Sequence, residues 1–117
     1  MAVRRIVTDL LTDNPGELAA FYRDVFGMET AMDGGFIVTI AGPGQQQVQL
    51  NLAREGGSDT PLPVMSVEVD DFDDTLNRIR DAGIQPSYGP VTEPWGVRRF
   101  YFTDPAGHLI NVLTHTT

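Results

Sequence analysis

The feature that most constrains how this chain folds is an apolar pattern that recurs after 54 positions. Each copy sets apolar side chains three or four residues apart, which is the spacing of one helix face. The shift superimposes Leu18 on Phe72, Tyr22 on Leu76, and Val25 on Ile79. Identity between the copies is nearly absent, so the pattern alone predicts an internal duplication. Because the chain has 117 residues, the two copies belong to one domain.

The first copy predicts a strand, a helix and a hairpin in that order. Residues 4–11 are rich in apolar and β-branched side chains, which favours a strand. Asn14 is a suitable helix cap, Glu17 stands three residues later as in a capping box, and Gly27 suits the helix end. Residues 33–35, Asp-Gly-Gly, are typical of a hairpin turn.

A further strand is predicted over residues 48–52, where one face is apolar and the other carries amides. Val48, Leu50 and Leu52 alternate there with Gln47, Gln49 and Asn51. Residues 54–62 are rich in glycine and proline, which favours a linker. The linker separates a first module of about residues 4–53 from a second of about residues 63–114.

The second module repeats the order of the first. A strand over residues 64–69 precedes a helix that Asp70-Asp71 opens and Asp81-Ala82-Gly83 ends, and short strands follow near residues 85–88, 97–103 and 108–113. Two β-α-β-β-β modules give an α+β domain in which a helix covers one face of each sheet. The other faces must meet each other, a ligand or a second subunit.

The strand predicted at residues 97–103 carries two kinds of side chain on its two faces. Arg99 and Tyr101 alternate with Phe100 and Phe102. We expect the two phenylalanines to face the helix, and Arg99 and Tyr101 to face away from it.

Composition excludes several partners. A formal charge of −8 argues against nucleic-acid binding, which needs a basic surface. The charge is compatible with attraction of a cationic small molecule, although it also serves solubility. No apolar run is long enough for a membrane span or a signal-peptide core. Since the chain has no cysteine, we expect a cytoplasmic protein.

Four stretches carry a resemblance to a known family. They are residues 18–28, with Phe21-Tyr22 before Gly27; residues 64–70; residues 81–84; and the closing segments 93–96 and 104–108. In this order they resemble the glyoxalase/bleomycin-resistance/extradiol-dioxygenase (vicinal oxygen chelate) family, and the closing segments are similar to those of bleomycin-resistance proteins. The resemblance implies paired modules around a cleft, a homodimer and, in catalytic members, a divalent metal held by four His or Glu side chains.

The metal ligands that the resemblance implies are missing from this sequence. Their positions fall on Val7, Val64, Asn111 and either Gln49 or Asn51. Valine has no lone pair, and neutral amides are poor ligands for a dication. We therefore predict no metal and no other cofactor.

Other residues with metal-binding or catalytic chemistry have simpler interpretations. His108 follows a turn, and His115 lies close to the C-terminus, where a solvated side chain is expected. The acids from Asp70 to Asp74 interact favourably with a helix N-terminus. Glu68 would act as a base only in a dry cleft, and a partly solvated glutamate is the plainer interpretation. No catalytic residue is assigned.

A curved and partly apolar cleft remains, which suits an organic ligand. The predicted ligand-binding residues are Gln49, Asn51, Glu68, Trp95, Arg99, Tyr101 and Asn111. Trp95 offers a flat surface for stacking, although packing at a dimer edge explains it equally well.

Three functional classes follow. We favour a metal-free homodimer that sequesters a planar or cationic organic compound without rapid chemistry. The alternative is a metal-dependent lyase, isomerase or dioxygenase whose ligands lie elsewhere. A third class is a module that binds another protein.

Overall fold

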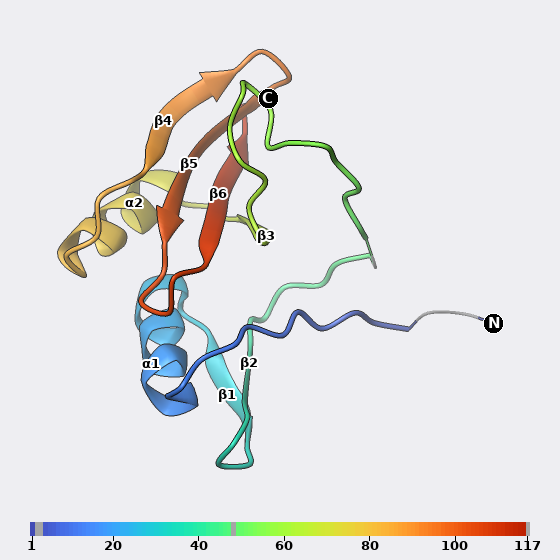
Figure 1. Cartoon of the computed structure of the whole chain (residues 1–117), viewed down its shortest axis with the longest axis vertical. Coiled ribbons are helices and arrows are strands. Elements are labelled where there is room, and N and C mark those ends of the chain that lie inside the picture. Colours follow the sequence, from blue (N-terminus) through green and yellow to red (C-terminus); the bar gives the residue numbers. More distant parts are fainter. Residues whose placement is uncertain (2–3, 48, 117) are drawn as a thin grey trace.

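A computed structural model gives the structure of residues 1, 4–47 and 49–116. The described residues form α1 (Pro15–Phe26), β1 (Glu29–Asp33), β2 (Val38–Ala41), β3 (Met65–Glu68), α2 (Phe72–Asp81), β4 (Tyr88–Glu93), β5 (Val97–Thr103) and β6 (Leu109–His115). Strands β1 and β2 form one sheet, and the other four form a second sheet of order β3-β6-β5-β4 (Figure 1). The predicted α+β class is confirmed.

Both helices begin and end where local chemistry dictates. The Asn14 carboxamide oxygen accepts the Glu17 backbone N–H at 3.1 Å, and its amide nitrogen donates to the Glu17 carboxylate at 3.1 Å. Gly27 ends α1 in the left-handed conformation. Asp71 caps α2 by accepting the Asp74 N–H at 3.0 Å. The neighbouring acids therefore belong to a helix start, as predicted.

One core joins the two helices to the larger sheet. Phe100 and Phe102 of β5 are fully buried against helix residues, as predicted from alternation. The buried cluster contains Val25, Phe72, Leu76, Ile79, Phe100, Phe102, Ile110 and Val112. Members of both superimposed triplets lie in this cluster, and all six of their residues are buried. The apolar pattern therefore marks the surface that each helix buries.

Hydrogen bonds to the Asp104-Pro105-Ala106-Gly107 turn join α1 to the larger sheet. One Asp104 carboxylate oxygen accepts the backbone N–H groups of Ala106 and His108, each at 2.9 Å. The other accepts the Tyr22 hydroxyl at 2.7 Å. Burial raises the pKa of Tyr22 far above its ordinary value, and the Asp104 hydrogen bond raises it further. Tyr22 therefore stays protonated and remains a donor.

The first module has fewer strands than predicted among the described residues. Residues 4–11 form no strand, nor do residues 49–52, and Val48 lies outside the described residues. In the second module the first and last strands along the chain, β3 and β6, stabilise each other by parallel pairing. The corresponding last strand of the first module would follow Gly42-Pro43-Gly44, and glycine and proline disfavour strands. Without it, residues 4–11 have no strand to pair with.

Strand β4 also differs from its prediction. It spans Tyr88–Glu93 rather than residues 85–88. The structure accommodates Gly89 and Pro90 in an edge strand by shifting the register between Tyr88 and Val91. Neither described helix has the length and apolarity that crossing a membrane requires.

Candidate functional site

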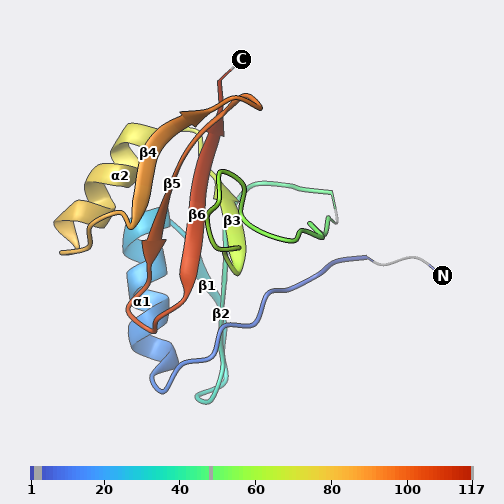
Figure 2. The same ribbon diagram turned by 45° about the horizontal axis from the view of Figure 1, so that its top comes forward.

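The candidate site lies on the face of the four-stranded sheet that the helices leave uncovered, which we call the helix-free face. Because side chains alternate along a strand, Arg99 and Tyr101 point to this face while Phe100 and Phe102 point to the core. Strand register aligns Ser66, Asn111, Tyr101 and Tyr88 across β3, β6, β5 and β4. Figure 2 shows the helices on one side of these strands and the loop before β3 on the other.

Arg99 and Glu93 form a buried ion pair on the helix-free face. The Arg99 Nη2 lies 2.6 Å from Glu93 Oε2, and its Nε donates to the same oxygen at 2.9 Å. Their side chains are 5% and 4% exposed. The carboxylate also accepts the hydroxyls of Tyr88 and Ser58, each at 3.1 Å. These hydrogen bonds compensate the loss of water that burial imposes on both charges.

The environment keeps both members of the pair charged. Burial by itself raises the pKa of Glu93, but hydrogen bonds from Arg99, Tyr88 and Ser58 outweigh it and hold the pKa below its ordinary value. Burial likewise opposes the charge on Arg99, but the hydrogen bond to Glu93 raises the Arg99 pKa overall. Neither residue is therefore poised to exchange a proton near neutral pH.

Three aromatic rings surround the Arg99 guanidinium. Its central carbon lies 5.0 Å from the Tyr101 ring centre, 5.1 Å from that of Trp95 and 5.3 Å from that of Tyr88. Trp95 is 53% exposed, so part of its ring faces solvent. The arrangement combines a fixed cation with a flat apolar surface, which suits a planar ligand with a polar edge.

A segment of the chain itself covers this cluster. We call residues 55–60 the strap, after the way they cross the helix-free face. Arg99 Nη1 donates to the Gly56 carbonyl oxygen at 2.8 Å, and Nη2 to that of Gly57 at 3.3 Å. The Thr60 hydroxyl lies 2.7 Å from the Tyr101 hydroxyl. The predicted linker is therefore a packed element, and it buries Arg99 and Tyr101.

A second pair lies on the same face but in solvent. His115 Nδ1 lies 2.7 Å from the Glu68 carboxylate, and both side chains are more than half exposed. The expectation of a purely solvated His115 was incomplete, because β6 extends far enough to bring its ring beside β3. His108 lies elsewhere, with its Nε2 2.7 Å from the Leu11 carbonyl oxygen.

The structure unites some predicted ligand-binding residues and separates others. Arg99, Tyr101 and Trp95 form the aromatic cluster, whereas Gln49 and Asn51 are exposed and outside any strand. Glu68 and Asn111 belong to the helix-free face but not to the bonds around Arg99. Sequence reasoning missed Glu93, Tyr88, Ser58, Gly56, Gly57 and Thr60. A hairpin at residues 94–96 would have indicated Glu93, because it sets that residue close to Arg99.

The positions implied for a metal do not fit one. Val7 and Val64 have no donor atoms, and Asn111 donates its amide to Ser66 Oγ at 3.0 Å. Within the described part of the chain, no three His, Cys, Asp or Glu side chains gather as metal ligands would. Glu68 and His115 supply only two such groups.

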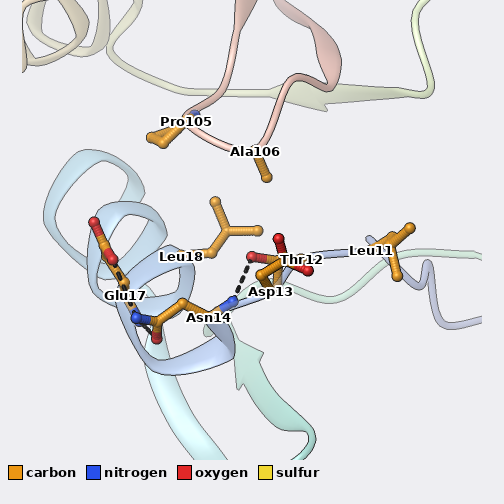
Figure 3. Close-up of a pocket in the computed structure, with 8 residues that line it drawn as sticks. All are labelled: Leu11, Thr12, Asp13, Asn14, Glu17, Leu18, Pro105 and Ala106. Carbon is orange, nitrogen blue, oxygen red and sulfur yellow. Dashed lines mark hydrogen bonds between the residues drawn. The ribbon is translucent and has the colours of Figure 1, made fainter.

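A cavity of about 400 Å³ lies at the other end of β5, beside the first turn of α1. Figure 3 shows Pro105 and Ala106 facing that turn across the cavity, with Asn14 bonded to Thr12 and Glu17. Asn14 and Glu17 are thus bonded to each other at the start of the helix. Nothing in its lining offers the chemistry found around Arg99.

Comparison with known proteins identifies relatives of this fold. The model of the Glyoxalase/Bleomycin resistance protein/Dioxygenase superfamily matches residues 4–112. A comparison with curated proteins finds no match. Among solved structures, a superfamily member from Sphaerobacter thermophilus DSM 20745 is 26% identical with a TM-score of 0.68, and the alignment covers 98% of each chain.

Two further structures share the fold at lower identity. TnmS3, described as an antibiotic binding protein from Streptomyces sp. CB03234, is 20% identical with a TM-score of 0.68 over 98% of each chain. TioX from Micromonospora sp. ML1 is 20% identical with a TM-score of 0.64 over 97% of each chain. Both structures therefore share the fold of this chain over nearly its whole length.

Proposed function

Because the chain belongs to the glyoxalase/bleomycin resistance protein/dioxygenase superfamily, we propose that it binds a planar organic small molecule on the helix-free face, without a metal ion and without rapid chemistry. The observation that carries the proposal is the Arg99 guanidinium held among three aromatic rings, one of them half exposed. TnmS3, which is described as an antibiotic binding protein, supports a sequestering role on the same fold.

The metal-free half of the proposal rests on donor chemistry. Valine at two implied ligand positions and an amide at a third would leave a dication short of ligands. The charged groups nearest the cluster, Glu93 and Arg99, are bonded to each other and not free to bind metal. The ligand would therefore be held by stacking and hydrogen bonds alone.

The net charge of the chain affects which ligands are attracted to it. A formal charge of −8 attracts cationic molecules and repels anionic ones over roughly 10 Å at 0.1 M salt. Close to the cluster, Glu93 already neutralises Arg99. We therefore propose a ligand that is neutral or cationic overall, with a planar part for Trp95.

A metal-dependent lyase, isomerase or dioxygenase is the second candidate function. The observation that favours it is the Glu68–His115 pair, because a carboxylate and an imidazole are the usual ligands of divalent metals. Two ligands would need at least one more group, and since the described residues bring no third His, Cys, Asp or Glu to this pair, a second subunit would supply it.

We also propose that the protein is a homodimer. Apolar side chains in the incomplete first module are exposed, including Ile6, Leu11, Leu50 and Leu52. Val64, next to β3, is exposed as well. Burying these residues against a second copy would give residues 4–11 and 49–52 the covered surface that one chain does not supply.

The absence of cysteine fits a reducing compartment, and we propose a cytoplasmic protein on that ground.

The proposal is tested with a set of planar aromatic compounds in cationic, neutral and anionic forms. Protein treated with a chelator is titrated while the fluorescence of Trp95, the only tryptophan, is recorded. We expect saturable changes with cationic or neutral compounds, and weaker binding of the cationic ones at high salt. If no compound binds the chelated protein, the proposed function is wrong.

A further inference from the structure

The strap occupies the hydrogen-bond donors that a ligand on this face would use. The carbonyl oxygen of Gly56 accepts a hydrogen bond from Arg99 Nη1 at 2.8 Å, and that of Gly57 accepts one from Nη2 at 3.3 Å. The Tyr101 hydroxyl also lies 3.2 Å from the Gly56 oxygen. Glu93 binds the other edge of the guanidinium, with Oε2 accepting from Nε at 2.9 Å and lying 2.6 Å from Nη2. The strap is thus bound to Arg99 as an outside molecule with carbonyl oxygens would be.

The strap reaches this position through unfavourable backbone conformations. Gly57, Ser58 and Asp59 have φ angles of 86°, 52° and 59°, three successive residues in the left-handed region. Only Gly57 is free of the penalty that a Cβ imposes there. Strain of this kind persists where surrounding contacts impose it, and here those contacts are with Arg99, Glu93 and Tyr101. The strap backbone can therefore release this strain when a ligand replaces its contacts with Arg99, Glu93 and Tyr101.

The fit also depends on two glycines. A Cβ on Gly56 would overlap the Pro61 carbonyl oxygen, the Tyr101 hydroxyl and the Thr60 hydroxyl. A Cβ on Gly57 would lie 2.9 Å from Trp95 Cη2. The strap backbone thus lies against the indole ring, on the surface where a planar ligand would stack.

One buried acceptor on the same face has no partner within the part of the chain that the structure describes. Asn111 Oδ1 is shielded from solvent and makes no hydrogen bond, although the amide nitrogen donates to Ser66. Asn111 lies directly across from Tyr101 in the strand register. A buried carbonyl oxygen without a donor is unfavourable, so a ligand N–H or O–H would be stabilised there.

We propose that the strap is a displaceable occupant of the binding site, and that the ligand is a neutral planar aromatic compound with a ring carbonyl and a ring N–H or O–H. The ring carbonyl replaces the strap oxygens on Arg99, the ring stacks on Trp95, and the donor pairs with Asn111. A carboxylate ligand is disfavoured because Glu93 already neutralises Arg99. This inference rests on the proposed function and narrows its ligand class.

The probes are 4-quinolone and quinoline, which share a bicyclic ring with and without the carbonyl and N–H. They are titrated into the wild-type chain, into Gly57→Ala and into Gly44→Ala. The last is a matched control, because a Cβ on Gly44 meets nothing within 4 Å. Gly57→Ala weakens the strap, so we expect it to bind 4-quinolone about tenfold more tightly than wild type, since less of the protein is held in the closed form. Gly44→Ala should match wild type, and quinoline should bind weakly throughout.

Hydrogen exchange supplies a readout that does not depend on the variant folding. The Gly56 N–H bonds to the Thr60 carbonyl at 2.9 Å, and the Thr60 N–H bonds to that of Gly57 at 3.0 Å. When 4-quinolone binds wild type, exchange at these two amides should speed up while β5 amides stay protected. Slower exchange in the strap, or equal binding of both probes, would overturn the inference. Failure of 4-quinolone alone would also overturn it, whereas the proposed function fails only if the whole compound set does.

Discussion

The two modules begin from the same apolar pattern but reach different degrees of completion. In the second, β3 and β6 pair in parallel and the sheet has four strands. In the first, the described residues form the hairpin β1–β2 and no further strand, and apolar side chains such as Leu50 and Leu52 stay exposed. The difference shows that alternation marks which face a strand would bury, but a strand also needs a paired neighbour and a surface to cover it.

A pair of phenylalanines gives the largest predicted contrast between the modules. Phe100 is fully buried in the shared core, whereas Phe36 in the β1–β2 hairpin is 86% exposed. Phe100→Ala should lower the free energy of unfolding by about 3–5 kcal/mol through lost burial and a cavity. Phe36→Ala should change it by less than about 0.5 kcal/mol. Urea unfolding measures both, and equal losses would contradict the placement of the core.

Loss of the Arg99–Glu93 ion pair, which lies beneath the strap, should lower the free energy of unfolding nearly as much as loss of the Phe100 side chain. Glu93→Gln leaves the Arg99 charge buried without its partner, so we expect a loss of about 3 kcal/mol. Asp73→Asn is the matched control, because Asp73 is 76% exposed, its partner Arg98 is 37% exposed, and surface pairs contribute under about 1 kcal/mol. A small effect of Glu93→Gln in urea unfolding would mean that the pair is not buried.

The Glu93 carboxylate also predicts how the free energy of unfolding depends on pH. The folded-state pKa of Glu93 is lowered, so its contribution is present above the unfolded pKa and is lost as the pH falls through the folded value. Wild type should therefore lose more stability than Glu93→Gln when the pH is lowered below the ordinary range of a glutamate. Parallel pH profiles of the unfolding free energy would show that Glu93 is not responsible.

Loss of the Tyr22–Asp104 hydrogen bond, which joins α1 to the second module, should have a somewhat smaller effect on the free energy of unfolding. Tyr22→Phe removes the donor that Asp104 accepts at 2.7 Å in a buried setting. We expect a loss of about 1.5–3 kcal/mol, which is the range for hydrogen bonds to charged groups. Thermal unfolding of Tyr22→Phe checks the value. An unchanged midpoint would indicate that the core alone holds α1 in place.

The smallest effect on the folding of one chain is expected at the exposed apolar residues of the first module. Leu52→Asp removes no buried contact, because Leu52 is 91% exposed. If the proposed dimer covers this segment, sedimentation should show wild type as a dimer at tens of micromolar and Leu52→Asp as a monomer. Gln85→Asp adds the same charge to an exposed loop of the second module and should stay dimeric. A monomeric wild type would contradict the dimer.

Sequence patterns predicted those parts of the fold that depend on local chemistry. The cap at Asn14, the stop at Gly27 and the inward-facing Phe100 and Phe102 follow from neighbouring residues, and the structure confirms them. The first and last strands predicted for the first module depend on pairing partners outside their own segments, and alternation did not reveal that residues 4–11 and 49–52 form no strand. The glycines and prolines of residues 54–62 concealed the strap, since they suggested a linker.

The strand residues of the candidate site could be predicted from the sequence, but the strap that covers them could not. Alternation predicted that Arg99 and Tyr101 leave the core, and both do. That residues 55–60 return over them depends on the Gly56 and Gly57 backbones bonding to Arg99, which composition does not indicate. The acidic partner Glu93 was hidden because its position opposite β5 requires the hairpin register.

The central claim is that the helix-free face binds a planar compound through Trp95 and Arg99 without a metal. Calorimetric titration of chelator-treated protein with the tightest-binding compound tests it most directly, with Trp95→Ala alongside wild type. The account predicts binding by the metal-free protein and a loss of about 1–2 kcal/mol in Trp95→Ala, on the scale of aromatic contacts. Binding that disappears on chelation and returns with a stoichiometric divalent metal would contradict it.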